Sequence, residues 1–489
     1  MDHSELRKNT IKNLIWRFAE RCGAQIVTFA VSVVLARILE PEVYGAIAII
    51  TIFISILQVF IDSGLGNALI QKKNADDLDF SSVFYFNIVI CFMLYLLLFA
   101  ASPWIADFYG MDILTPAIRI LGLTLVISGI KNVQQAYVSR NLLFKKFFFS
   151  TLAGTIGAAV IGIVMAYLGF GIWALIGQAL FNALVDTLVL WFTVKWRPRW
   201  MFSLERLKAL FSYGWKILVS SLINTIYFDL RQLIIGRLYT SADLAFYNRG
   251  QQIPNIITTN INTSIDSVLF PVLSKKQDHV QELKAMTRRA IKTSTYIMWP
   301  AMIGLMAAAD SLVEVLLTDK WAFSIPYLRI FCFIYAITPM QTANINAIKA
   351  IGKSGLYLKL EVIKKVFGIL LILAVSQISV FAIASSLILY TFFALFVNMT
   401  PNKKLLGYQY KEQFQDILPS FGLSLVMGGI VFLFSFLEIP NILILIIQVV
   451  TGILVYIAGS SILHFETYEY LKSIITDFIH KDRGKKVKV

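Results

Sequence analysis

Long apolar runs separated by short polar joins dominate the chain, and the first run extends from Leu14 to Leu39. A helix that crosses a hydrocarbon core of ~30 Å needs ~20 apolar residues. By this measure the pattern predicts an all-α polytopic membrane protein with about fourteen transmembrane helices, whose ends are set to within ~3 residues. The predicted helices cover about 13–39, 44–69, 80–106, 114–138, 147–168, 171–195, 211–236, 244–272, 290–317, 325–349, 357–377, 379–400, 417–437 and 441–464.

Two of these helices are unusually polar. The ranges 211–236 and 244–272 carry Asn, Thr, Asp and Arg side chains among their apolar residues. Such residues in a spanning helix favour a wet interior over contact with lipid. All joins between the predicted helices are short, which leaves no room for a folded extramembrane domain.

Basic residues alternate from join to join. The N-terminus, every second join and the C-terminal tail hold roughly thirty Lys and Arg, and the joins between them hold a handful. Because Lys and Arg concentrate in cytoplasmic loops, this bias predicts that both termini are cytoplasmic and supports an even number of helices. The segment from Phe465 to His480 alternates aromatic and charged residues and predicts an amphipathic helix along the inner membrane surface.

A weak internal repeat joins the two halves of the chain. Leu35–Leu39 has a counterpart about 200 residues later in Ile235–Tyr239, and Ile118–Ile120 matches Leu328–Ile330 in a similar register. Two parallel six-helix halves with an added helix pair are a transporter architecture. The predicted division is an N-terminal lobe at 1–200, a C-terminal lobe at 201–405, a helix pair at 406–464 and a cytoplasmic basic tail at 465–489.

Composition excludes several other classes of protein. Hydrophobic residues make up 57% of the 489 residues and charged residues 15%, so a water-soluble enzyme is excluded. The net charge of +15 is explained by the loop bias and does not require a nucleic-acid partner. Cys22, Cys91 and Cys332 lie within apolar runs with no metal-binding or disulfide spacing, and we expect them to be buried.

Charged side chains within the first and seventh helices are the candidate substrate ligands. The first helix carries Arg17, Glu20 and Arg21, and the seventh carries Lys216 and Arg231. An ionised group in hydrocarbon costs on the order of 3 kcal/mol, so each needs a reason to be there. Guanidinium groups suit phosphate because they offer forked donors, whereas Arg17 and Lys216 could also extend to the inner headgroups as anchors.

Carboxylates in apolar surroundings are candidates for ion coupling. Asp62, Asp229 and Asp266, together with Glu20, lie within the predicted helices. Burial raises a carboxyl pKa toward neutrality, so one of them could bind a proton or a sodium ion. Salt bridges to cavity arginines and the capping of helix ends are the alternative roles.

The repeat also places basic residues and prolines at matched depths. Arg37 and Arg237 lie near outer helix ends, where they could close an outer gate through ion pairs or act as interfacial anchors. Pro254, Pro300 and Pro339 lie within predicted helices of the second half, where proline removes a helical hydrogen bond. These three positions are candidate hinges, with static kinks as the alternative.

No enzyme signature stands out. The four histidines do not cluster with Cys, Asp or Glu, and no phosphate-binding Gly-rich loop that ends in Gly-Lys occurs. We therefore expect no metal, no cofactor, no ATP hydrolysis and no catalysis by this chain.

Two motifs resemble a known family. Leu35–Gly45 reads Leu-Ala-Arg-Ile-Leu-Glu-Pro-Glu-Val-Tyr-Gly, and Asp62–Gln71 reads Asp-Ser-Gly-Leu-Gly-Asn-Ala-Leu-Ile-Gln. They are similar to the Leu-Ala-Arg-x-Leu-x-Pro-x-x-Tyr-Gly and Asp-x-Gly-Leu-x-x-Ala-Leu-Ile-Gln elements of polysaccharide transporters. These belong to the multidrug/oligosaccharidyl-lipid/polysaccharide (MOP) superfamily. The likeness runs from about Lys12 to Leu405 and is strongest to Wzx-type flippases of the colanic acid and teichuronic acid exporter branch.

This resemblance implies the MOP flippase fold, with two six-helix lobes around a cationic cavity in the bacterial cytoplasmic membrane. It implies movement of an undecaprenyl-pyrophosphate-linked oligosaccharide from the inner to the outer leaflet by alternating access. It assigns the pyrophosphate to cations that map onto Arg17, Arg21 and Lys216, and Arg231 is our addition from its depth. The expected partners are this lipid, membrane lipids, H+ or Na+, and a polysaccharide polymerase and glycosyltransferases, with no nucleic acid.

Three alternatives stay open. A peptidoglycan-precursor (lipid II) flippase would use the same cationic chemistry. A cation-coupled drug exporter of the same superfamily would favour a cavity rich in carboxylates. A membrane glycosyltransferase or polymerase would need a larger outer loop than any join here provides.

Overall fold

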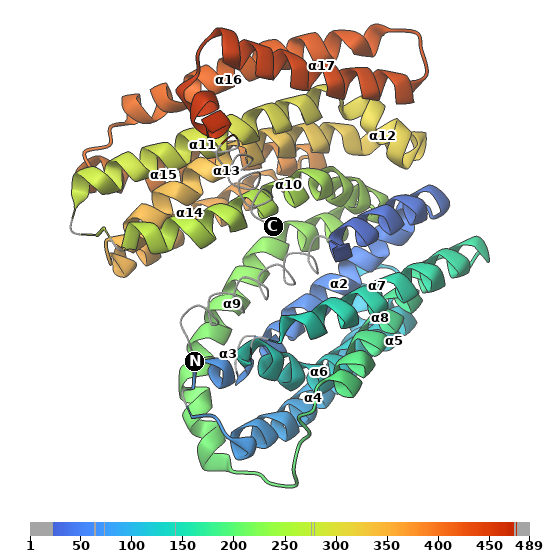
Figure 1. Ribbon diagram of the computed structural model, residues 1–489. Coiled ribbons are helices and arrows are strands. Elements are labelled where there is room, and N and C mark those ends of the chain that lie inside the picture. The colour runs from blue at the N-terminus through green and yellow to red at the C-terminus, as the bar shows by residue number, and fades with distance from the viewer. Residues whose placement is uncertain are drawn as a thin grey trace, which may run out of the picture. The chain divides into compact units, whose positions relative to one another are not determined.

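The computed structural model describes residues 23–473, apart from 63, 64, 73, 142, 275 and 278, and also residue 476. Every regular element in this part of the chain is a helix, as the apolar runs predict. Contacts divide the chain into two compact units, Met1–Ala245 (unit 1) and Phe246–Val489 (unit 2). Each unit is described by itself, and Figure 1 shows the course of the chain through both.

Unit 1 begins, in its described part, with a helix over Gly23–Ile38. The other helices of unit 1 are α2 (Pro41–Asp62), α3 (Leu65–Gln71), α4 (Asp77–Tyr109), α5 (Leu114–Leu121), α6 (Leu123–Arg140), α7 (Phe144–Tyr167), α8 (Ile172–Thr193) and α9 (Leu204–Leu238). The longest of them, α9, packs against α2, α3 and α4.

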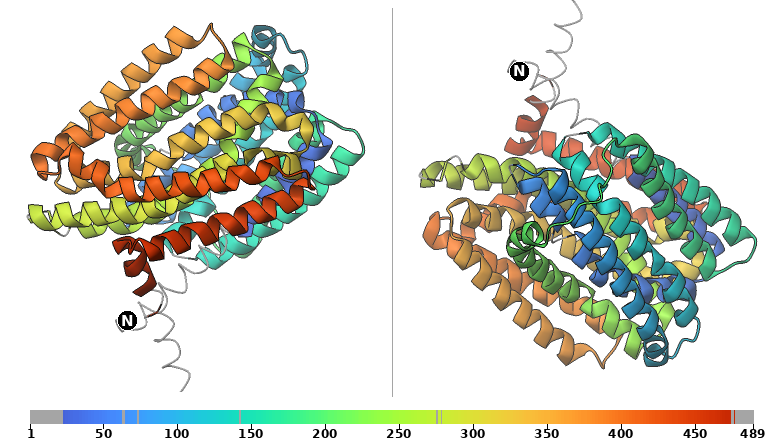
Figure 2. Two further views of the ribbon diagram at one scale, coloured as in Figure 1. Left: turned by 90° about the horizontal axis from the view of Figure 1, so that it is seen from above. Right: turned by 90° about the horizontal axis from the view of Figure 1, so that it is seen from below.

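Unit 2 takes in all but the first turn of α10 and every later helix. Its elements are α10 (Ser241–Ser274), α11 (Val280–Ala307), α12 (Ala309–Leu317), η1 (Asp319–Ser324), α13 (Ile325–Ala350), α14 (Ser354–Val375), α15 (Val380–Leu405), α16 (Tyr410–Leu433), η2 (Phe434–Phe436) and α17 (Asn441–Ile462). Residues 466–473 form a further helical segment. Helix α11 packs against α13 and α16, and α17 lies beside α16 (Figures 1 and 2).

The number of membrane spans predicted from the sequence is higher than the number of described helices that are apolar enough to cross a membrane. Ten described helices are long and apolar enough to cross a membrane, and α11 with α12 adds a bent pair that turns by 70°. Helices α10 and α14 also occupy predicted spans, but their polar and charged residues make them less apolar than these ten helices. The described residues therefore show a multi-pass membrane protein, and the count of fourteen stays a prediction.

The predicted lobe boundaries also stay predictions. The two units divide at Ala245, whereas the repeat predicts a first boundary at about residue 200 and a second at about 405. Helix α9 contacts α2, α3 and α4, which explains why it groups with unit 1. Helices α16 and α17 group with unit 2 through α11, and the segment after residue 465 is helical as far as residue 473.

Close helix packing depends on small residues within each unit. A Cβ atom on Gly129 of α6 would lie 2.5 Å from the Cys91 sulfur on α4, and one on Gly428 of α16 would lie 2.4 Å from Ile303 on α11. Glycine therefore allows these helix pairs to approach closely, as is common in membranes. Cys91 and Cys332 are buried and free, in agreement with the expected packing role, and Cys22 lies outside the described residues.

Candidate substrate and ion sites

The predicted phosphate-binding cations are placed only in part. Arg17, Glu20 and Arg21 lie outside the described residues. Lys216 is exposed on α9, between one and two turns before the middle of that helix. An exposed ammonium group in a candidate span needs water or an anion, since hydrocarbon does not solvate it. Lys216 therefore keeps its role as a predicted ligand.

Arg231 and Asp229 lie deeper on α9 and have separate surroundings. Arg231 is only 5% exposed, and its guanidinium carbon lies 5.7 Å from the centre of the Tyr227 ring one turn earlier. The Asp229 carboxylate accepts a hydrogen bond of 2.9 Å from the Ser55 hydroxyl of α2. Asp229 is thus bound to the neighbouring helix of unit 1, and Arg231 stacks on its own helix.

Asp62 and Asp266 have matched partners in the two units. In unit 1, Asn132 of α6 donates to Asp62 of α2 at 3.2 Å. In unit 2, Asn346 of α13 donates to Asp266 of α10 at 2.6 Å. Asp62 and Asp266 are about 200 residues apart along the chain, and so are Asn132 and Asn346. This distance is the period of the repeat. The repeat thus extends from sequence to a polar contact between equivalent helices.

The Asp62 contact belongs to a wider group of amides. Gln58 donates to the same Asp62 oxygen at 3.1 Å, and Asn87 donates to the Asn132 side-chain oxygen at 3.3 Å. A carboxylate surrounded by amides has oxygens that can accept a proton or help to bind a small cation. Among the described residues, however, no group of three or more His, Cys, Asp and Glu could hold a metal ion.

The predicted gate arginines differ in their contacts. The Arg237 guanidinium lies 4.7 Å over the Phe108 ring within unit 1, while Arg37 is exposed. The repeat also matches Arg119 with Arg329, and each of them has a contact within its own unit. Arg119 donates to Ser102 at 3.0 Å, and Arg329 pairs with Asp310 at 2.5 Å. Arg119 thus contacts α4, the helix before its own, and Arg329 contacts α12 across η1.

The candidate hinges lie inside helices α10, α11 and α13. The Pro254 carbonyl accepts a hydrogen bond of 2.8 Å from the Thr258 hydroxyl, and Pro339 is buried in α13. Pro300 has no N–H, so the carbonyl of Tyr296 loses its helical partner. The Tyr456 hydroxyl of α17 donates to this carbonyl at 2.8 Å. The carbonyl that Pro300 leaves without a helical donor in α11 is therefore bonded to α17.

This contact gives a stability prediction. Tyr456→Phe should lower the free energy of unfolding by about 1–3 kcal/mol, because the Tyr296 carbonyl is left buried without a donor. Pro300→Ala restores an N–H that can bond to this carbonyl, so the double variant should recover most of the loss. Thermal unfolding in detergent measures both; equal losses in the single and the double variant would contradict the assignment.

Sequence reasoning missed an ion pair inside unit 1. Lys131 of α6 and Asp186 of α8 lie 3.0 Å apart, and their side chains are 19% and 14% exposed. The Ser150 hydroxyl of α7 also donates to Asp186, so three helices meet at this carboxylate. The rule that flags charges in apolar runs applies equally to Asp186 and would have found it.

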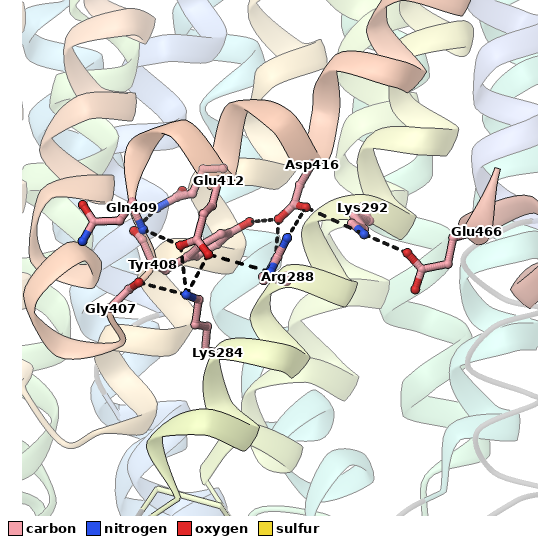
Figure 3. A network of polar contacts seen from close by, with 10 residues as sticks. Lys284, Arg288, Lys292, Gly407, Tyr408, Gln409, Glu412, Asp416 and Glu466 are labelled. Atoms are coloured by element: carbon pink, nitrogen blue, oxygen red, sulfur yellow. Dashed lines mark hydrogen bonds and ion pairs between the residues drawn. The ribbon is translucent and has the colours of Figure 1, made fainter.

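A larger ionic network joins α11 to α16 and to the segment after α17 (Figure 3). Arg288 binds Asp416 with two hydrogen bonds of 2.7 and 2.8 Å, and Lys284 contacts Glu412 at 2.9 Å. Lys292 lies 2.8 Å from Glu466, and this hydrogen bond holds the pKa of Glu466 below its usual range. Burial raises the pKa of Tyr408, whose hydroxyl donates to Asp416 at 2.6 Å.

Comparison with known proteins identifies the family. Residues 34–326, more than half of the chain, match the polysaccharide biosynthesis protein family. The chain belongs to this family. The match takes in most of unit 1 and the first part of unit 2, and it confirms the resemblance found in the two motifs.

Three relatives from this functional group are similar over most of their length. The succinoglycan biosynthesis transport protein ExoT of Rhizobium meliloti (strain 1021) is 27% identical, over 71% of this chain and 70% of its own. The teichuronic acid biosynthesis protein TuaB of Bacillus subtilis (strain 168) is 27% identical, over 83% and 84%. The lipopolysaccharide biosynthesis protein WzxC of Escherichia coli (strain K12) is 24% identical, over 86% of each chain.

Solved structures show the fold. The lipid II flippase MurJ in its inward closed conformation aligns with a TM-score of 0.75, over 93% of this chain and 99% of its own, at 16% identity. An inward-facing multidrug resistance MATE family transporter of the MOP superfamily aligns with a TM-score of 0.61, over 78% and 94%, also at 16% identity. The chain is thus a membrane protein of polysaccharide biosynthesis with the fold of MOP transporters.

Proposed function

We propose that this protein moves a polyprenyl-pyrophosphate-linked oligosaccharide, with undecaprenyl as the lipid, from the inner to the outer leaflet of the bacterial cytoplasmic membrane. The movement occurs by alternating access and serves the export of a surface polysaccharide. The observation that carries the proposal is that a chain of the polysaccharide biosynthesis family has, over 93% of its length, the fold of a lipid flippase. A glycan on a lipid carrier is the cargo that agrees with both the family and the fold.

The diphosphate is bound by cations of the first and seventh helices in this proposal. Arg17, Arg21 and Lys216 take this role, and Arg231 adds positive charge further along α9. Lys216 is supported by its exposure within a candidate span, and Arg231 is included because of its depth on α9. The sugars occupy the polar interior, and the lipid tail stays in the bilayer.

Coupling to H+ or Na+ would use the carboxylates Asp62, Asp229 and Asp266, with Glu20 as a further candidate. The matched Asp–Asn contacts favour Asp62 and Asp266, because equivalent groups in both units could respond alike to one ion. Arg37 and Arg237 serve the outer gate, and Pro254, Pro300 and Pro339 allow α10, α11 and α13 to bend. The charge bias of the joins supports a cytoplasmic position for both termini.

Complementation tests the cargo. In a bacterium that lacks its own polysaccharide flippase, expression of this chain should restore surface polysaccharide, provided the cell makes the matching lipid-linked glycan. The control is the same cell with a Lys216→Gln variant, which should express and fail. Absence of surface polysaccharide with the matching glycan supplied, in cells that accumulate it on the inner leaflet, would reject the proposal.

The second candidate function is lipid II flipping, which the TM-score of 0.75 to MurJ favours. Depletion of the peptidoglycan-precursor flippase in the same host discriminates the two. We expect no rescue of growth by this chain, because its family match is to polysaccharide biosynthesis. Rescue of growth would make lipid II the cargo.

A further inference from the structure

One face of α11 changes from cationic to apolar along its length. The residues that line two adjoining cavities of unit 2 recur at steps of three and one, the spacing of a single helix face. At the end near Val280 these are Ala285, Arg288, Arg289, Lys292 and Thr293. Further along they are Tyr296, Ile297, Pro300, Ala301, Gly304, Leu305 and Ala308.

The cationic end is a cavity of about 440 Å³ closed by the segment after α17, which contributes Glu466, Thr467 and Tyr470. Arg289 is exposed, and its guanidinium carbon lies 4.8 Å from the centre of the Tyr470 ring. Within the described ranges no carboxylate lies within 4 Å of its guanidinium, although Glu466 is near enough for its charge to be felt. Lys292 already holds an oxyanion, the Glu466 carboxylate, whose side chain is 79% exposed.

Asp416 also faces this end and limits which cations are available. It takes two hydrogen bonds from Arg288 and lies 3.7 Å from Lys292. Arg289 and Lys292 are therefore the groups that can bind an incoming anion. Basic pockets between helices on the cytoplasmic side bind anionic lipid headgroups.

The apolar end is a groove of about 490 Å³ between α11, α16, α17 and α10. Val449, Ile453 and Ile457 of α17 form part of its wall and are each about half exposed, so the groove opens to the surface of unit 2. From Thr293 to Gly304 the helix rises about 16 Å, close to half of a ~30 Å hydrocarbon core. One acyl chain of a single leaflet has this length.

We propose that unit 2 binds one anionic phospholipid, with its phosphate on Arg289 and Lys292 and an acyl chain in the groove between α11 and α17. The charge bias of the loops places the cationic end at the cytoplasmic leaflet, where phosphatidylglycerol supplies the phosphodiester. A polyprenyl diphosphate fits less well, because its chain is longer than one leaflet and its two phosphates carry more negative charge than Arg289 and Lys292 can balance. Glu466 competes with the phosphate for Lys292.

The test is lipid binding to the delipidated full chain, followed by native mass spectrometry. Phosphatidylglycerol should bind at least about tenfold more tightly than phosphatidylcholine with the same acyl chains, because only the former carries a net charge. Arg289→Gln should weaken phosphatidylglycerol binding about fivefold, and the control Lys404→Gln, an exposed cation on α15 outside both cavities, should not. Equal affinity for the two lipids, or no effect of Arg289→Gln, overturns the proposal.

Two further variants separate the headgroup and chain contacts. Glu466→Gln should strengthen phosphatidylglycerol binding, because Lys292 is released. Unchanged or weaker binding would contradict the competition between Glu466 and the phosphate for Lys292.

Ala301→Phe fills the groove and should reduce phosphatidylglycerol binding, with Ala301→Leu as a milder substitute if the first variant elutes as aggregate. Normal binding in a folded groove-filled variant, or displacement of phosphatidylglycerol by equimolar polyprenyl diphosphate, overturns the assignment of the groove to a phospholipid.

Discussion

Lys216→Gln and Arg21→Gln are each expected to reduce export of the lipid-linked oligosaccharide at least about tenfold, while the protein stays folded in the membrane. The physical reason is the loss of a charge-assisted contact with phosphate, which contributes about 1.5–3 kcal/mol. Surface polysaccharide per cell, normalised to the amount of protein in the membrane, measures the effect.

Two control variants define the role of charge at Lys216. Lys216→Arg keeps the positive charge and should retain most of the export. Lys208→Gln removes an exposed cation two turns earlier on the same helix and should leave export unchanged. Full export in both Lys216→Gln and Arg21→Gln would remove these residues from the mechanism.

Asp416→Ala should be strongly destabilising. The Asp416 side chain is 4% exposed, and it accepts hydrogen bonds from Arg288 and Tyr408. Removing this carboxylate should cost about 2–3 kcal/mol, because the Tyr408 hydroxyl loses its acceptor and Arg288, which is partly exposed, keeps only Glu412 at 3.9 Å. For a unit of this size we expect a fall in melting temperature of about 4–10 °C in detergent.

An exposed ion pair at the start of α11 is the matched control. Lys276 and Glu282 lie 2.9 Å apart, with side chains 45% and 50% exposed. Exposed pairs contribute little to stability because water screens their charges, so Glu282→Ala should change the melting temperature by no more than about 2 °C. Similar shifts for Asp416→Ala and Glu282→Ala would show that the network in Figure 3 does not hold α16 on α11.

Hydropathy predicted the helices well where one apolar run forms one helix, as in α8 and α17. It placed the start of the ninth span near residue 290, whereas α11 begins at Val280. The additional turns carry Lys284 and Arg288, which look like a polar loop in the sequence. They are helical because α16 supplies Glu412 and Asp416 as partners, and such pairing between distant helices is not visible in a local pattern.

The candidate sites too were predicted from the sequence only in part, because their partners lie on distant helices. Asp62 and Asp266 were identified as charges in apolar runs, but their Asn partners lie about 70–80 residues away on other helices. Amides are less conspicuous than charges in a hydropathy pattern, so the matched Asp–Asn contacts emerge only from the packing of α2 on α6 and α10 on α13. The rule that flags charged residues in apolar runs, by contrast, could have identified Lys131 and Asp186 from the sequence.

The most direct measurement of the proposed activity is transbilayer movement in vesicles that contain only this protein and a fluorescent polyprenyl-pyrophosphate oligosaccharide. A membrane-impermeant reductant that quenches the outer label separates the two leaflets. We predict that label originally on the inner leaflet becomes accessible with the wild-type chain and stays protected with Lys216→Gln. Equal protection in wild-type and protein-free vesicles, under imposed H+ and Na+ gradients of either direction, would contradict lipid-linked oligosaccharide transport.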